Sequence, residues 1–491
     1  MKRTGVSIAK TSHFSYERAI FALPTIDARP YTPSATMDES YTSDEEPLNQ
    51  TLIADDIPAC GATSGLSQSE LFAVVENAVS PAPIVHFFDK QQTQRGKKIV
   101  ASLNKVKTRR LFGALSALLQ RVVQEEAHVC IDDGDERPVQ SLRFLKLCAD
   151  FAYAHISTAK KTIVDEVLDV ATLLHDSLFA LHEADGTIAR HAAAASSSIF
   201  LLCEKWWHAR LDDKEQLVTQ LIPLLLLSSL QDTATKADVK RLYSMREAFD
   251  LLDFTDISIA SLQTQLLRTI SQPLFLHCLE GKRFLSHLFT LKELVVALHS
   301  AVKVQILSKR SILEAYAEVY WGAWKHLATA ETGEDEEARE DAFTSLEENA
   351  LQDLAYMTIH AASPTTAKNC RILLDKFLLY KKDPEVEGML YRVHGPILWR
   401  SVLSSNARVR MQAAVALGDT FPLKDGSSRD VVRYEAVVTK TVEAVVKLMR
   451  DEIPNVRVEG CICAGKILKG FWVAIPSSDI RILLNGELFY L

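Results

Sequence analysis

The chain has 491 residues, of which 47% are hydrophobic and 24% are charged, so it carries enough apolar material for a large core. Its formal net charge of −8 at pH 7 excludes a general attraction to nucleic acid or anionic membrane, and any such contact requires a local basic patch. Its eight cysteines include no C-x-x-C pair, a pattern typical of a reduced intracellular protein.

Residues 1–66 are rich in serine, threonine, proline and acidic side chains, with the run Tyr41–Pro47 near their centre. Such a composition buries too little apolar surface to offset the entropy lost on ordering. We therefore predict a disordered N-terminal tail. Ser43 precedes three acidic residues and is a candidate phosphorylation site, although a plain solvated tail explains the same pattern.

From residue 67 onward, apolar residues recur at helical spacing between short polar breaks, and no sustained alternation indicates a strand. Ser67 and Glu70 have the spacing of a capping box, which predicts a helix start. The acidic run from Glu331 to Asp341 predicts an exposed loop. The fold class predicted for residues 67–491 is all-α, a HEAT/armadillo-like helical-repeat array.

One predicted helix is strongly basic. Its lysines and arginines lie on or beside an apolar stripe that runs from Ile99 through Val106 to Leu118. Basic charge at this density is a candidate contact for nucleic-acid phosphates, and a solvated helix face is the alternative. The candidate residues are Lys97, Lys98, Lys105, Lys107, Arg109 and Arg110.

A repeated signature lies near the C-terminus, where the pairs Val409-Arg410 and Val456-Arg457 are 47 residues apart. That spacing lies at the top of the range for HEAT or armadillo units, each a helix pair that needs a neighbour to bury its apolar face. We expect the two arginines to act as struts between repeats, and two asparagines to cap the helices. The signature comprises Asn406, Val409, Arg410, Ala413, Leu417, Asn455, Val456 and Arg457.

No nucleotide-binding loop, zinc-protease motif or nucleophile elbow occurs in the sequence. We therefore predict a protein that is not an enzyme, with no catalytic residue, no cofactor and no metal site. No stretch is apolar over the roughly 18 residues that a membrane span needs, so we expect no membrane partner. A long helix-lined surface without catalytic groups is typical of proteins that bind extended peptides or nucleic acid.

Five blocks follow one another from the middle of the chain onward in a recognisable order and spacing. They are Cys203–Trp207, Ala237–Leu242, Gly281–Phe289, Tyr316–Lys325 and Glu387–Arg400. Through these blocks, the chain from about Trp206 to Trp472 resembles the G-type HEAT-repeat non-SMC subunit of the condensin II complex. Members of that family are much longer, so we expect the array to be truncated at the C-terminus, within a repeat.

The resemblance implies a non-catalytic scaffold subunit of condensin II that supports mitotic chromosome condensation and segregation. Its implied partners are the kleisin subunit, DNA or chromatin, and, through the complex, the SMC ATPase pair. The implied location is the nucleus, on chromosomes. Repeat architecture alone also fits a HEAT-repeat adaptor for nuclear transport or phosphatase scaffolding, and this alternative stays open at the level of sequence.

Overall fold

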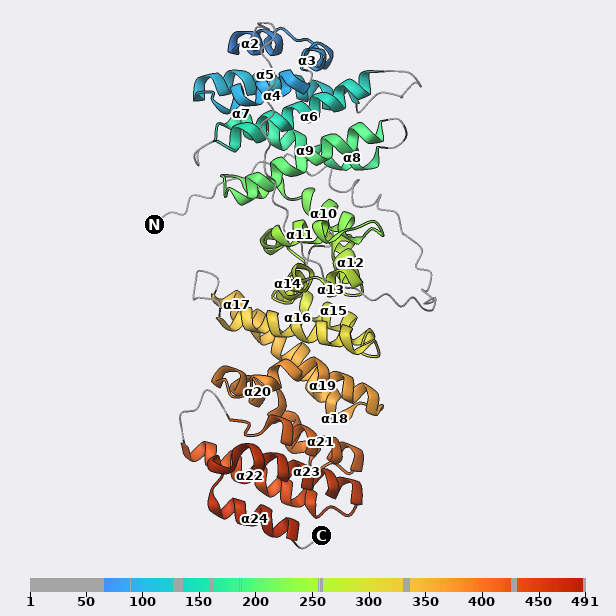
Figure 1. The fold of residues 1–491 in the computed structure, drawn as a ribbon, viewed down its shortest axis with the longest axis vertical. Coiled ribbons are helices and arrows are strands. Elements are labelled where there is room, and N and C mark those ends of the chain that lie inside the picture. Colours follow the sequence, from blue (N-terminus) through green and yellow to red (C-terminus); the bar gives the residue numbers. More distant parts are fainter. Residues whose placement is uncertain are drawn as a thin grey trace, which may run out of the picture. The chain divides into compact units, whose positions relative to one another are not determined.

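The computed structural model describes residues 66–88, 90–126, 136–158, 163–184, 186, 188–254, 256, 259–329, 336–424 and 431–488. The predicted tail, including Ser43, falls almost entirely outside these ranges, so its disorder stays a prediction. The described residues are helical and contain no strand, which confirms the all-α class. They form two compact units, one ending at Gln220 and the other beginning at Leu221 (Figure 1).

The first unit is built from helices that pack on one another. Helix α6 packs on α3, α4 and α9, and helix α5 packs on α2 and α7. The helices are α2 (Gln68–Glu76), α3 (Pro81–Phe87), α4 (Lys90–Ala101), α5 (Lys105–Glu126), α6 (Arg137–Ile156), α7 (Asp165–Asp176), α8 (Leu178–Glu183), α9 (Ala189–His208) and the short η1 (Lys214–Leu217).

Local chemistry explains where the first helices begin. The capping box predicted at Ser67 is present: the backbone N–H of Glu70 donates to the Ser67 hydroxyl at 3.3 Å, and the Glu70 carboxylate accepts from the Ser67 N–H at 2.8 Å. The single basic helix predicted through residues 97–118 is wrong, because the chain breaks between α4 and α5. Asn104 causes the restart, since its Oδ1 accepts from the N–H of Lys107 at 3.0 Å.

The second unit continues the same construction with more elements. Its helices are α10 (Leu221–Leu230), α11 (Lys236–Ser244), η2 (Arg246–Leu251), α12 (Ala260–Thr269), α13 (Pro273–His277), α14 (Leu279–Leu288), α15 (Lys292–Val304), α16 (Arg310–Thr329), α17 (Glu336–Ser345), η4 (Leu346–Leu351), α18 (Gln352–His360), α19 (Pro364–Leu379), α20 (Pro384–Ser401), α21 (Ala407–Thr420), α22 (Val431–Met449), α23 (Pro454–Phe471), η5 (Trp472–Ala474) and α24 (Ser477–Leu488).

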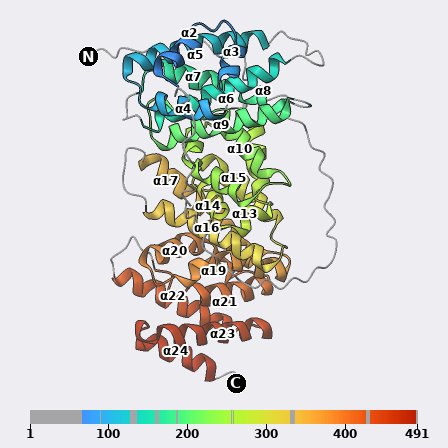
Figure 2. The same ribbon diagram turned by 45° about the horizontal axis from the view of Figure 1, so that its top comes forward.

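Successive helix pairs of this unit stack on one another, as Figure 2 shows for its C-terminal part. The pairs α18/α19, α20/α21 and α22/α23 each pack internally, and α21 packs along α23 of the next pair. This is the arrangement of HEAT-like repeats. The acidic loop predicted from Glu331 to Asp341 is wrong for its second half, because Glu336 begins α17. Glu336 and Glu337 lie in the first turn, where carboxylates interact favourably with the helix dipole.

The core of the C-terminal repeats consists of the apolar residues of the repeated signature and their neighbours. Val409, Ala413, Leu417 and Val456 are all buried in one cluster. Gly460, which follows Ala413 by 47 residues, allows α23 to approach α22 closely: a Cβ at this position would lie 2.8 Å from the Met449 backbone nitrogen. Small residues at this position therefore set the distance between helices.

Candidate interaction surfaces

The six predicted phosphate contacts lie on α4 and α5 of the first unit, and most of them have partners within the chain. Lys97 pairs with Asp150 at 3.2 Å and Arg109 with Glu166 at 3.6 Å, which ties the basic helices to α6 and α7. Arg110 pairs with Glu76, and the Lys107 ammonium donates to Gln68 at 2.9 Å. These four side chains connect helices in addition to presenting charge.

Lys98 and Lys105 differ from the other four. Both are exposed, and neither has a hydrogen-bond or ion-pair partner among the described residues. Val106, expected in the apolar stripe, is 75% exposed, because the restart at Asn104 places it on the outer side of α5. Lys98, Lys105 and Val106 are therefore the positions of this segment that are most available to a partner.

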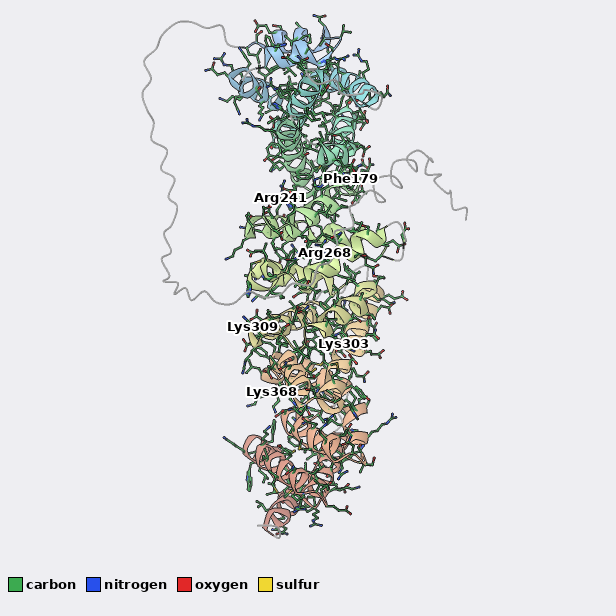
Figure 3. All side chains as sticks on the ribbon, turned by 90° about the vertical axis from the view of Figure 1, so that its right-hand side faces the viewer. Phe179, Arg241, Arg268, Lys303, Lys309 and Lys368 are labelled. Carbon is green, nitrogen blue, oxygen red and sulfur yellow. The ribbon has the colours of Figure 1, made fainter. Side chains whose placement is uncertain are left out.

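A second group of basic residues was not found from the sequence. In Figure 3, Lys303 and Lys309 lie between Arg268 and Lys368 along the second unit. Lys303 is held by Asp353 at 2.8 Å, whereas Lys309 and Lys368 are exposed and have no partner in the described part of the chain. The four residues come from different helices or their ends, spread over 100 positions, so no sequence window could reveal them.

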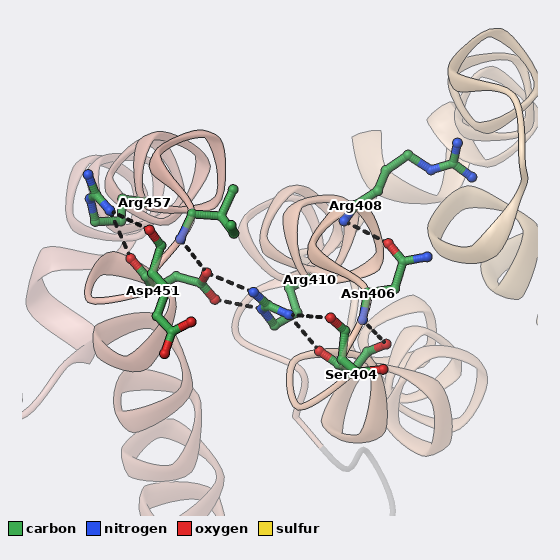
Figure 4. A network of polar contacts seen from close by, with 9 residues as sticks. Ser404, Asn406, Arg408, Arg410, Asp451 and Arg457 are labelled. Atoms are coloured by element: carbon green, nitrogen blue, oxygen red, sulfur yellow. Dashed lines mark hydrogen bonds and ion pairs between the residues drawn. The ribbon is translucent and has the colours of Figure 1, made fainter.

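Of the two signature arginines, Arg410 joins one repeat to the next, whereas Arg457 bonds only within its own loop in the described chain (Figure 4). Arg410 donates to the carbonyls of Ser404 and Ser405 at 2.8 and 3.0 Å, which closes the loop before its own helix α21. The same guanidinium makes two bonds to Asp451 of the next pair, at 2.6 and 2.8 Å. Arg408 reaches in the opposite direction and donates to the Ala361 carbonyl at 2.6 Å. Neighbouring helix pairs are thus cross-linked on both sides.

The second copy repeats part of this geometry. Arg457 donates to the carbonyls of Asp451 and Glu452 at 3.0 and 3.2 Å, the positions 47 residues after Ser404 and Ser405. Asn406 caps α21, with its Oδ1 accepting from the Arg408 N–H at 3.0 Å.

The cap expected at Asn455 is wrong. The residue that precedes α23 is Ile453, which follows Asn406 by 47 residues, and Pro454 occupies the first turn. The Asp451 carboxylate accepts from the Ile453 N–H at 3.0 Å instead. The repeat spacing therefore places a nonpolar residue at the cap, and Asp451 supplies the acceptor from two positions earlier.

Two of the sequence blocks that carry the family resemblance meet at a buried carboxylate. Glu347 on η4 is 5% exposed and accepts from Arg392 of α20 through two bonds of 2.7 Å. Its Oε1 also accepts from the Trp324 indole of α16 at 2.9 Å. Three elements are joined here, because a buried carboxylate is stable only when it is fully paired.

Among the described residues, no group of three or more histidine, cysteine, aspartate or glutamate side chains is placed to hold a metal ion. Within the same ranges, no helix has the length and apolar character needed to cross a membrane. The surfaces with recognisable chemistry are therefore the basic patches and the aromatic and acidic surroundings of Glu347.

Residues 268–425 match the family model described as condensin II non structural maintenance of chromosomes subunit. The condensin-2 complex subunit G2 of Mus musculus is 29% identical over 331 residues, which cover 66% of this chain and 27% of the relative. The Homo sapiens subunit of the same name is 29% identical over 354 residues, which cover 69% of this chain and 29% of the relative. The chain thus spans less than a third of the length of these curated relatives.

Among solved structures, the karyopherin Kap121p bound to the SUMO protease Ulp1p is matched over 85% of this chain and 49% of that chain. The sequence identity is 11% and the TM-score is 0.22, so this likeness supports neither a shared function nor a shared partner. The family match is different, since it covers the region that contains α16, η4 and α20 with their buried Glu347. Over this region and beyond it, the chain is similar to the G-type non-SMC subunits of condensin II.

Proposed function

We propose that the chain is a non-catalytic HEAT-repeat scaffold of condensin II that binds the kleisin subunit and DNA on chromosomes in the nucleus. The observation that carries the proposal is the match to condensin-2 complex subunit G2 over about two thirds of the chain. The SMC ATPase pair, reached through the complex, would supply the energy of nucleotide hydrolysis.

The repeat geometry supports a scaffolding role. The pairs α20/α21 and α22/α23 are fixed to each other by Arg410 and Asp451, and Arg408 fixes α21 to the end of α18. Cross-links of this kind keep the exposed side chains of neighbouring repeats at fixed distances and orientations to one another. A partner that extends over several repeats gains affinity from such preorganisation, because less ordering is needed on binding.

For DNA, we propose that the basic helices α4 and α5 contact phosphates, chiefly through Lys98 and Lys105. These two ammonium groups lack partners in the described chain, so binding DNA breaks no internal ion pair. The other four basic residues keep their contacts to Glu76, Asp150, Glu166 and Gln68 and contribute to the local potential.

The test is DNA binding by the full chain, measured by fluorescence anisotropy at several salt concentrations. Replacing Lys98 and Lys105 with alanine should weaken binding about equally for different DNA sequences. It should also reduce the slope of log affinity against log salt by about 2, because each phosphate contact contributes roughly 0.9.

The matched control carries Lys309→Ala and Lys368→Ala, which removes the same charge from two exposed lysines of the second unit. This control should keep the wild-type slope. If the slope falls in the control and not in the Lys98 and Lys105 variant, DNA contacts the lysines of the second unit and not α4 and α5. Equal slopes in all three proteins would show that neither pair of lysines contacts DNA phosphates.

A further inference from the structure

A pocket of about 550 Å³ lies in the second unit between α16, α17 and α20. Trp324, Leu327 and Phe343 give it apolar and aromatic surface, and the Trp324 and Phe343 ring centroids are 6.1 Å apart. Trp324 itself is only 3% exposed, so its ring lies deep beside the hollow. The pocket is large enough for a long side chain and part of the backbone that carries it.

Both arginines that line the pocket are already engaged inside the protein. Arg392 makes its two bonds to Glu347, and Arg339 donates to the Leu327 carbonyl at 2.9 Å. The guanidinium carbon of Arg392 also lies 5.9 Å from the centre of the Phe343 ring. The pocket thus contains one guanidinium held by a carboxylate and an aromatic ring, the chemistry by which proteins bind such groups.

The negative charges around the pocket are not compensated in this way. Glu336 and Glu340, one turn apart on α17, and Glu385 in the first turn of α20 all line it and are exposed. None of the three carboxylates forms an ion pair with a described residue. Glu347 neutralises Arg392, and the positive charge of Arg339 offsets only one of the three glutamates, so the pocket presents an excess of negative charge.

We propose that this pocket binds a lysine or arginine side chain from an extended basic segment of a partner protein. The aliphatic stem of such a side chain packs against Phe343 and Leu327, while its charged end meets the carboxylates. The proposal goes beyond the assignment to condensin II, since it concerns a site separate from α4 and α5 and a partner segment of opposite charge to DNA.

The test uses the full chain and a short labelled peptide that alternates glycine, serine and arginine, with binding followed by fluorescence anisotropy. Replacing Glu336, Glu340 and Glu385 together with glutamine should weaken binding about tenfold, because three partly shielded charge pairs are lost. The same peptide with citrulline in place of arginine should bind the wild-type chain about as weakly as the arginine peptide binds this variant.

The matched control carries Glu293→Gln, Glu435→Gln and Glu443→Gln, three exposed glutamates elsewhere in the second unit. It changes the net charge equally and should change affinity less than twofold. Equal loss in both triple variants would overturn the proposal, since the peptide would then sense only overall charge. Undiminished binding of the citrulline peptide, tighter binding of a phosphoserine peptide, or no measurable binding of the arginine peptide would each overturn it as well.

Discussion

Arg410 and Asp451 form a two-bond ion pair that joins successive helix pairs of the second unit, with bonds of 2.6 and 2.8 Å. Both side chains are largely buried, at 17% and 10% exposed. The Arg410 guanidinium also closes its own loop through two carbonyls, and Asp451 also accepts from the N–H of Ile453. One contact therefore determines both the shape of each loop and the stacking of one repeat on the next.

Arg410→Ala should lower the free energy of unfolding by about 2 to 3 kcal/mol, because it removes a charge-assisted pair and leaves the shielded Asp451 carboxylate without its cation. Arg457→Ala is the matched control. Arg457 bonds only to the carbonyls of its own loop in the described chain, so its loss should cost about 1 kcal/mol. Urea unfolding followed by circular dichroism gives both values, and equal losses would show that the pair with Asp451 adds nothing.

Gly460→Ala should destabilise the chain by about 1 to 3 kcal/mol, because the added Cβ meets backbone atoms of Leu448 and Met449 at 2.9 and 2.8 Å. Gly465→Ala on the same helix is the control. A Cβ at Gly465 meets nothing within 4 Å, and alanine is the better helix former by about 1 kcal/mol, so this variant should be more stable. Thermal melting distinguishes them. Similar melting temperatures in the two variants would mean that α22 can move away from the added Cβ of α23 without loss of stability.

Arg392→Ala should destabilise the chain by about 2 kcal/mol, because it leaves the buried Glu347 without its cation. The cost is kept below that of a fully buried pair, since Arg392 is 49% exposed and water can reach part of the site. Adding Glu347→Gln to the same chain should restore about half of the loss. Urea unfolding of the two single variants and the double variant tests this, and additive losses would contradict the coupling.

His394 should make stability fall as the solution becomes acidic. It is 3% exposed, and burial lowers the pKa of its imidazole from the ordinary 6.5 to about 4. The unfolded chain takes up the proton first as pH falls below 6.5, so this residue's contribution is intact above that pH and is lost progressively toward pH 4. The loss reaches about 3 kcal/mol at pH 4.

The comparison for this prediction is His394→Gln, which removes the titrating group. Urea unfolding between pH 7 and pH 4 should show a smaller decline for this variant than for the wild-type chain. Parallel declines in the two proteins would mean that His394 takes up its proton as readily when folded as when unfolded.

Residue spacing predicted the elements that depend on local chemistry. Ser67 and Glu70 share one helix start, and Val409, Ala413 and Leu417 lie on one helix face, so periodicity alone indicates the cap and the core. The break at Asn104 was not predicted because the surrounding apolar residues keep helical spacing through it. An asparagine in such a pattern can either cap a new helix or lie within a continuous one, and tertiary packing decides between the two. The cap was wrongly predicted at Asn455 because asparagine is a common capping residue. The 47-residue spacing from Asn406 places the cap position at Ile453 instead.

The surfaces could be predicted much less well. The candidate cluster on α4 and α5 was found because its charges are contiguous, yet the partners of Lys97 and Arg109 come from helices that follow 40 or more residues later. The acidic pocket combines α16, α17 and α20, whose residues become neighbours only when the helices pack. Lys309 and Lys368 are separated in the same way. Tertiary packing decides which charges are neutralised, and the local sequence around each charge does not predict that packing.

The proposed membership of a condensin II assembly is tested most directly by identifying the proteins that co-precipitate with the endogenous gene product from mitotic cells. Quantitative mass spectrometry should recover a kleisin subunit and two SMC ATPases in near-equal amounts with it. Recovery of a Ran-type GTPase or a phosphatase core, with no kleisin and no SMC protein, would contradict this membership.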